Sequence, residues 1–268
     1  MTPSGRQVYL CILLFRTRAT LPFVLCALLV TGRSAVSVLE AQTRPAAIPR
    51  TADGKPDLQG IWKAASGIAA DLTKGVVEGG SIPYQPSAAK QRAENFAARA
   101  TADPLSKCYM PGVPRIMYLD YPFHIFQTND AVAITFAWQQ VFRLIHTNGS
   151  KPADGIEFWM GDSRGRWEGD TLVVNVTNHN DRTWLDAAGN FHSEALKLVE
   201  RFTLIDQDTI RYEVTVEDPK VFTKPWKMSL PLSRQKNLTR ILEYQCQAEA
   251  EEANGLFERD PRTWYPKK

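Results

Sequence analysis

The chain has 268 residues, of which 44% are hydrophobic, 10% aromatic and 23% charged. This composition is typical of a globular protein with one large domain, and it excludes collagen-like, low-complexity and wholly disordered chains. The net charge of +3 arises in residues 1–41, which hold four arginines against a single glutamate, Glu40. The rest of the chain carries 32 − 4 = 28 basic and 29 − 1 = 28 acidic side chains. Because the positive and negative charges are equal in number, the charge balance argues against a nucleic-acid partner.

Residues 1–41 have the pattern of a signal peptide. An apolar run, Leu21–Val30, follows the basic residues Arg16 and Arg18, as the h-region of a signal peptide follows its n-region. The run has only about half of the ~20 residues that a spanning helix needs. We therefore expect cleavage near residue 41, a periplasmic or secreted protein, and no stable membrane span after cleavage. Retention as a membrane anchor and a cytoplasmic location are the alternatives.

Cleavage at that point would leave two cysteines, Cys108 and Cys246. Exported proteins meet an oxidising compartment, so these two residues are expected to form a disulfide. The alternative is a pair of buried thiols. Neither cysteine has a CxxC partner or a histidine at ligand spacing, so the sequence predicts no metal site there.

The remaining pattern predicts a mainly β domain over residues 58–247, after a Pro-rich linker over 42–57. Residues 86–100 are rich in Ala, Lys, Gln, Arg and Glu and predict the one N-terminal helix. Short runs of β-branched and aromatic residues follow, separated by turn residues, which is typical of an antiparallel barrel or sandwich. A polar tail is expected over 248–268. The strands are expected at 58–63, 116–118, 123–128, 131–137, 139–146, 165–167, 171–176, 194–204, 209–217 and 238–246.

Two motifs carry a resemblance to known families. Gly60-Ile61-Trp62 resembles the G-x-W pattern in the first strand of lipocalins. That resemblance implies that the tryptophan closes one barrel end against an arginine, for which Arg240 is the expected residue. The run Gly161–Val174 (GDSRGRWEGDTLVV) resembles a motif of uncharacterised exported bacterial proteins, and the similarity extends over about residues 55–246. It implies export and a lipocalin-like barrel, and it carries no catalytic residues. The supporting segments are Trp184-Leu185-Asp186, Glu200-Arg201-Phe202, Asp218-Pro219 and Pro225-Trp226.

One acidic residue is expected inside the barrel. In the strand at 194–204, Glu200 shares the apolar face with Leu198 and Phe202, and His192 has the same parity. A buried carboxylate needs a charged or hydrogen-bonding partner, or its pKa rises. Glu200 is therefore a candidate general acid or base, and the alternative is a structural ion pair. The partners left open are Arg143, Arg211 and Arg240.

A polar loop after the strand at 171–176 provides the other candidate catalytic residues, His179, Asp181 and His192. This set would suit an acid–base pair or a divalent metal, while the alternative is a turn whose Asn and Asp side chains bond the backbone. The glycines of 161–170 lack phosphate-loop spacing and predict a tight hairpin instead. Serine-hydrolase, zincin and dinucleotide motifs do not occur, so the sequence predicts no cofactor and no dedicated metal site.

Aromatic residues suggest a ligand. An antiparallel barrel can hold one small apolar molecule in its interior, and the candidate ligand-binding residues are Trp138, Phe142, Phe158, Trp159 and Tyr212. We therefore expect an exported barrel protein that binds a small hydrophobic or aromatic molecule in its cavity. The alternative is a cofactor-independent hydrolase or isomerase that uses the His, Asp and Glu residues at the barrel mouth.

Overall fold

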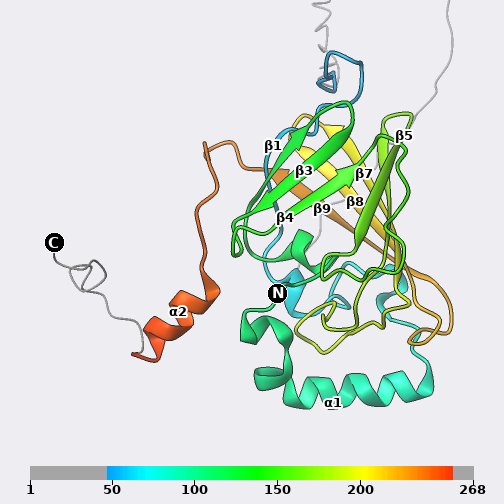
Figure 1. Cartoon of the computed structure of the whole chain (residues 1–268), viewed down its shortest axis with the longest axis vertical. Coiled ribbons are helices and arrows are strands. Elements are labelled where there is room, and N and C mark those ends of the chain that lie inside the picture. Colours follow the sequence, from blue (N-terminus) through cyan, green and yellow to red (C-terminus); the bar gives the residue numbers. More distant parts are fainter. Residues whose placement is uncertain (1–46, 256–268) are drawn as a thin grey trace, which may run out of the picture. The chain divides into compact units, whose positions relative to one another are not determined.

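Nine strands close into a single barrel in the computed structural model, which describes residues 47–255 (Figure 1). Each strand pairs with the next along the chain, and β9 pairs with β1 to complete the circle. The expected mainly β barrel is confirmed, while the signal-peptide prediction and the end of the tail lie outside the described residues. The strands are β1 (Gly60–Ala64), β2 (Phe123–Gln127), β3 (Ala131–Phe136), β4 (Phe142–His146), β5 (Asp162–Glu168), β6 (Thr171–Thr177), β7 (Lys197–Asp206), β8 (Thr209–Glu217) and β9 (Trp226–Arg234).

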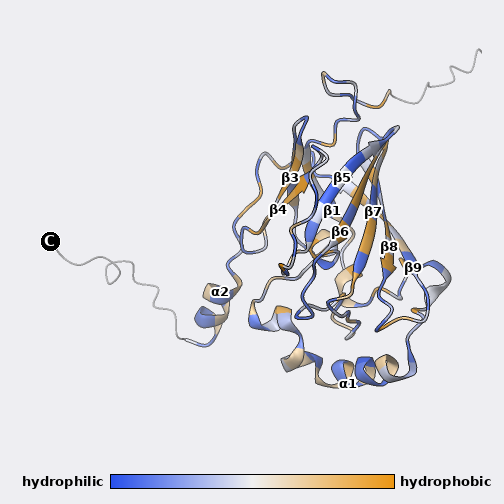
Figure 2. Ribbon diagram, turned by 45° about the vertical axis from the view of Figure 1, so that its right-hand side comes forward, coloured by the Kyte–Doolittle hydropathy of each residue, from blue (hydrophilic) through white to orange (hydrophobic). Residues whose placement is uncertain are grey.

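Alternation of side chains sets the two faces of the barrel wall. In β8, Ile210, Tyr212, Val214 and Val216 are buried, while the residues between them are exposed or half-buried. The strands carry most of the strongly hydrophobic colour in Figure 2, and hydrophilic and weakly hydrophobic residues alternate along helix α1. Tight hairpins join β5 to β6 and β7 to β8, as the turn residues at 168–170 and 206–208 predict. Period-two patterning therefore locates most of the wall.

One strand pair departs from the antiparallel expectation. β4 and β5 run parallel, because the long connection over residues 147–161 returns the chain to the same end of the barrel. They pair over two residues only, Ile145 with Ser163 and His146 with Arg164. Lipocalin barrels have eight strands joined up and down. This barrel has nine strands and one parallel pair, so the wall is mostly antiparallel but differs from a lipocalin barrel at this point.

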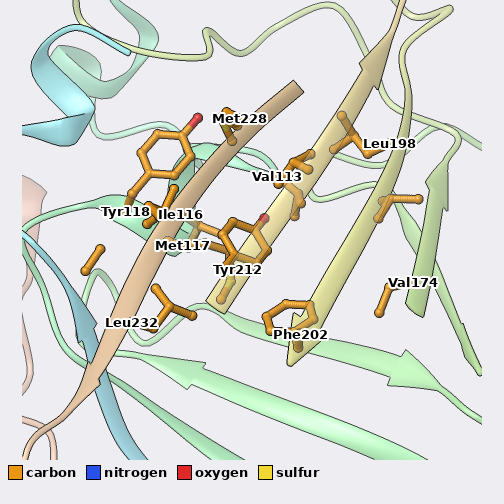
Figure 3. Close-up of a cluster of buried hydrophobic side chains, with 14 of the residues drawn as sticks. Val113, Ile116, Met117, Tyr118, Val174, Leu198, Phe202, Tyr212, Met228 and Leu232 are labelled. Atoms are coloured by element: carbon orange, nitrogen blue, oxygen red, sulfur yellow. The ribbon is translucent and has the colours of Figure 1, made fainter. Parts of the chain in front are cut away.

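A segment expected to be a strand instead enters the barrel. Ile116–Tyr118 belongs to a 3₁₀ helix, η4 (Arg115–Tyr118), all of whose residues are buried. Figure 3 shows Ile116, Met117 and Tyr118 among the inward side chains of β7, β8 and β9. A short apolar run cannot distinguish a buried strand from a buried helical turn, which explains the wrong prediction. Side chains from the wall and from η4 pack together as one hydrophobic core.

The prediction of a last strand at residues 238–246 is also wrong. Residues 238–246 contain no strand, and Leu238 and Leu242 are exposed. The wall is closed instead by β9, whose alternating pattern contains Pro231. Proline lacks an N–H and normally argues against a central strand, which is why this segment did not stand out. The residues after it lead to a short helix, α2 (Cys246–Ala253).

The predicted N-terminal helix is confirmed as α1 (Pro86–Ala102). It lies against the loop around Gly189, and Asn95 donates a hydrogen bond to the Gly189 carbonyl (3.3 Å). The approach is close, since a Cβ added at Gly189 would lie 2.7 Å from the backbone nitrogen of Phe96. The described part of the expected linker, residues 47–57, is tied to the β5–β6 turn by Arg50, which donates to both carboxylate oxygens of Asp170 (2.9 and 2.8 Å). Of the helices in residues 47–255, none combines the length and apolarity needed to cross a bilayer.

Trp62 closes one end of the core, but its partner is not the expected Arg240. The guanidinium of Arg234 lies over the Trp62 ring at 4.1 Å, and it donates to the carbonyls of Gln59 (2.6 Å) and Gln207 (2.8 Å). The Trp62 indole N–H donates to the Leu58 carbonyl (2.9 Å). Arg240 follows β9 and is exposed. The prediction failed because it rested on the misplaced last strand.

The disulfide between Cys108 and Cys246 is present, with the Cα atoms 5.5 Å apart. It joins residues that are separated by 138 positions. Cys108 follows the 3₁₀ helix η3 (Pro104–Lys107), and Cys246 begins α2. The bond therefore fastens the C-terminal helix to the segment before η4.

The contact between Trp62 and Arg234 requires glycine at position 60. A Cβ there would overlap Nη1 of Arg234, and φ is +123°. We expect Gly60→Ala to lower the free energy of unfolding by about 2–5 kcal/mol, from backbone strain and displacement of the guanidinium. Gly54→Ala is the matched control, because Gly54 also has positive φ but nothing within 4 Å; it should cost only about 1–2 kcal/mol. Urea unfolding measures both, and equal losses would contradict the proposed crowding.

Candidate functional site

The short pairing of β4 and β5 leaves an opening on the outside of the barrel. Beyond Ile145 and His146, the residues Phe142–Leu144 of β4 have no strand beside them on the β5 side in the described part of the chain. The connection between the two strands passes over this opening. A groove of about 520 Å³ lies between this connection and β4. We call it the seam groove. Its volume is within the range of small-molecule sites.

The walls of the seam groove are mainly apolar. Phe142 points outward and is 71% exposed, which is unusual for a phenylalanine side chain. Trp159 is held by its ring contact with Tyr109 (centroids 5.5 Å apart) and by the guanidinium of Arg182, 5.9 Å from the ring. The apolar lining residues are Met110, Phe142, Leu144, Phe158, Trp159 and Met160.

Two polar residues reach the groove from the inner face of the wall. Arg143 and Ser163 line it, yet both are almost completely buried. The Ser163 hydroxyl accepts from Nε (3.1 Å) and Nη2 (3.0 Å) of Arg143. The groove therefore ends at a charged, hydrogen-bonded floor that belongs to the barrel interior.

Arg143 makes an ion pair with Glu200 inside the barrel. Nη1 donates to Oε1 of Glu200 (3.0 Å), and Nη2 donates to Oε2. The Tyr212 hydroxyl also donates to Oε1 (2.5 Å). Burial lowers the pKa of Arg143, but the charge and hydrogen bonds of Glu200 outweigh it, so the pKa is raised overall. Burial, followed by the Glu200 charge, raises the pKa of Tyr212. Every group in this network is satisfied, which favours the structural ion pair over a free acid or base.

The two loop histidines also lie close together. The His179 and His192 rings meet edge to face with centroids 5.7 Å apart, and both are buried. His192 is within 2.7 Å of the Thr183 hydroxyl through Nε2 and within 2.9 Å of the Ser193 carbonyl through Nδ1. With Nδ1–H donating to that carbonyl, Nε2 accepts from Thr183. Burial lowers the pKa of His192.

His179 is the more unusual of the pair. Within residues 47–255, neither ring nitrogen of His179 has a hydrogen-bond partner. The edge of the ring lies against Gly161, where an added Cβ would be 2.7 Å from Cε1 of His179. Burial, with smaller contributions from His192 and Arg143, lowers its pKa to about 3. The Val176 carbonyl acts in the opposite direction and raises the pKa of His179, although this carbonyl and the imidazole ring do not have the geometry of a hydrogen bond. His179 is therefore a neutral core residue at ordinary pH.

The other residues predicted from the sequence do not all belong to one site. Phe142, Phe158 and Trp159 come together in the seam groove. Trp138 does not line the groove and instead contacts Tyr121 and Tyr244, and Tyr212 lies in the interior network. Asp181 is exposed. Within residues 47–255, no three His, Cys, Asp or Glu side chains gather as a metal site would require.

The sequence alone leaves the partner of Glu200 open and does not indicate Met110 or Ser163 as site residues. The signal for Arg143 was ambiguous, because apolar residues in β4 occur at both parities: Phe142 and Leu144 face outward, and Ile145 faces inward. Only the closure of the barrel decides which of the two faces of β4 points to the core.

No protein-family model and no curated protein matches this chain. The interpretation of the site therefore rests on its geometry.

The ion pair provides a stability test. We expect Glu200→Gln to lower the free energy of unfolding by about 3–5 kcal/mol, because it leaves the buried Arg143 without a counter-charge. Glu213→Gln is the matched control: Glu213 lies on the neighbouring strand and pairs with Arg211 in a mostly exposed ion pair, so its loss should cost less than about 1 kcal/mol. Chemical denaturation measures both. Similar small losses would show that the buried pair does not stabilise the barrel.

The pKa of His179 predicts a pH dependence. The unfolded state binds a proton at this residue below about pH 6.5, whereas the folded state does so only near pH 3. His179 thus contributes stability that is complete above pH 6.5 and is lost as pH falls towards 3, by up to about 1.4 kcal/mol per unit. In His179→Leu the difference in unfolding free energy between pH 7 and pH 4.5 should shrink accordingly. An unchanged difference would contradict the assignment.

Proposed function

We propose that this protein is an exported barrel that binds a small, neutral apolar or aromatic molecule in the seam groove. The observation that carries the proposal is the exposure of Phe142 on a groove of about 520 Å³ with apolar walls. Exposed apolar groups gathered in a concave site usually mark a ligand surface. The ligand thus binds outside the barrel wall, and not in its interior as the aromatic content suggested, because η4 and the inward side chains occupy the interior.

The arginines that line the groove favour a neutral ligand over an anion. Arg143 is paired with Glu200, and Arg164 donates to both oxygens of Asp162 (2.6 and 2.8 Å). Because these cations already have counter-charges, an anionic ligand would have to compete for them. An aromatic ring would stack on Phe142 or Trp159 without that cost.

Export is supported by the disulfide, which persists mainly in oxidising compartments. The contact between Trp62 and Arg234 supports a relationship to lipocalins, since it closes a barrel end in the way the G-x-W motif implies. We propose both together with membership of the exported bacterial group that shares the Gly161–Val174 motif.

Acid–base catalysis is the weaker alternative. Glu200 is held by Arg143 and Tyr212, and both nitrogens of His192 already have partners. A hydrolase or isomerase would need one of these groups free to reach a substrate.

The neutral fluorophore N-phenyl-1-naphthylamine tests the binding site. We expect Phe142→Ala to weaken its binding about tenfold, because the ligand loses roughly 1.4 kcal/mol of apolar contact. Phe126→Ala is the control: Phe126 is also exposed on the outer wall, but it does not line the groove, so binding should change less than twofold. A fluorescence titration measures both. Equal losses, or no binding by the parent protein, would refute the proposed site.

A further inference from the structure

A second cavity, of about 640 Å³, shares no lining residue with the seam groove. Its walls come from η3, η4, the segment around Trp138 and α2. Both cysteines of the disulfide line it, so we call it the disulfide cavity. Elements more than a hundred residues apart in sequence thus meet at one concave surface.

Hydrogen bonds fix these walls in place. Gln139 donates its backbone N–H to the Tyr244 carbonyl (2.7 Å) and its side-chain amide to the Cys108 carbonyl (2.7 Å). Tyr244 in turn donates to the Ala137 carbonyl (3.0 Å). Together with the disulfide, these bonds hold the C-terminal segment against the turn before β4, and the cavity is therefore pre-formed.

Three aromatic rings line the cavity in mutual contact. The ring centroids of Tyr121 and Tyr244 are 4.6 Å apart, and that of Trp138 lies 5.5 Å from Tyr121 and 5.1 Å from Tyr244. Burial, Tyr244 and the nearby carboxylates of Glu249 and Asp120 all raise the pKa of Tyr121. The Tyr121 phenol therefore stays neutral.

The charged groups that line the cavity leave a negative excess. Arg115 donates to both oxygens of Asp103 (2.7 Å each), which neutralises that pair. Asp120 and Glu249 also line the cavity, and neither forms an ion pair within the described part of the chain. Asp120 accepts only a long hydrogen bond from the Gly67 nitrogen (3.4 Å). Two unpaired carboxylates therefore stand beside the aromatic cluster.

We propose that the disulfide cavity binds a small organic cation of the alkylammonium class. Its charge would face Asp120 and Glu249, and its alkyl groups would contact Tyr121, Trp138 and Tyr244. Aromatic faces attract cations through their quadrupole, and the attraction increases as the cation loses water. Asp120 and Glu249 are exposed at the rim of the cavity. They would repel an anion, and a neutral apolar molecule would gain nothing from their charge. This site is independent of the seam groove, so its test does not depend on the proposed function.

Isothermal titration of the full-length, oxidised protein with choline tests the proposal at low salt, where screening is weak. The control ligand is 3,3-dimethyl-1-butanol, which has the shape of choline without its charge. Choline should bind at least tenfold more tightly than the alcohol. Equal affinities would overturn the proposal in favour of a merely apolar cavity, and no heat from choline at 20 mM would overturn it outright.

Variants locate the cation within the chain. Asp120→Asn and Glu249→Gln should each weaken choline binding about three- to tenfold, as expected for the loss of one nearby charge. Glu251→Gln is the matched control, since it removes the same charge from α2 at a residue that does not line the cavity; binding should change less than twofold. Equal effects of Glu249→Gln and Glu251→Gln would show only general surface electrostatics and would refute the site.

Tyr121→Leu separates the aromatic contribution from the charge. We expect it to weaken choline binding while leaving the alcohol unaffected within about twofold, because only the cation uses the ring quadrupole. Circular dichroism confirms that each variant is folded. If Tyr121→Leu binds choline as tightly as the parent does, the aromatic part of the proposal is wrong.

Discussion

The buried ion pair between Arg143 and Glu200 links the weakest part of the barrel wall to the strongest. Arg143 comes from β4, Ser163 from β5, Glu200 from β7 and Tyr212 from β8. The backbone joins β4 to β5 through only two residue pairs, whereas β7 and β8 pair along nearly their whole length. Side chains that cross the interior thus hold together strands that the backbone holds poorly. Such a pair is costly to break, because each partner would remain as an uncompensated buried charge.

The same short pairing explains where a ligand can bind. A longer pairing between β4 and β5 would close the gap between the two strands in which the seam groove lies. Inside the barrel, η4 and the inward side chains of β6–β9 fill the space that a carrier would leave open (Figure 3). Concave surfaces therefore form where loops meet the wall: at the seam, and beside the disulfide. The wall supplies rigidity, and the connections supply the sites.

The two sites differ in the chemistry they offer. The seam groove has apolar walls and a floor whose charges are paired, which suits a neutral ring. The disulfide cavity combines aromatic rings with two unpaired carboxylates, which suits a cation. The disulfide covalently fixes one wall of the second cavity only. Reduction would therefore alter that cavity directly while leaving the seam groove in place.

Some features of this protein follow from its sequence alone. Alternating apolar residues predict the strands β2, β3, β6, β7 and β8, and the parity of Glu200 with Leu198 and Phe202 predicts a buried carboxylate. Two cysteines in a chain that is expected to be exported predict one disulfide. These are local or counting arguments, and they need no knowledge of neighbouring strands.

Tertiary structure alone decided the rest. The partner of Glu200 is Arg143 because β4 and β7 face each other across the interior, a relationship that spacing in the chain does not encode. The seam groove depends on how far β5 pairs with β4, and the role of Ile116–Tyr118 depends on a space that only a closed barrel creates. Period-two patterning predicts which residues share a face. Only the packing of distant segments determines what each face meets.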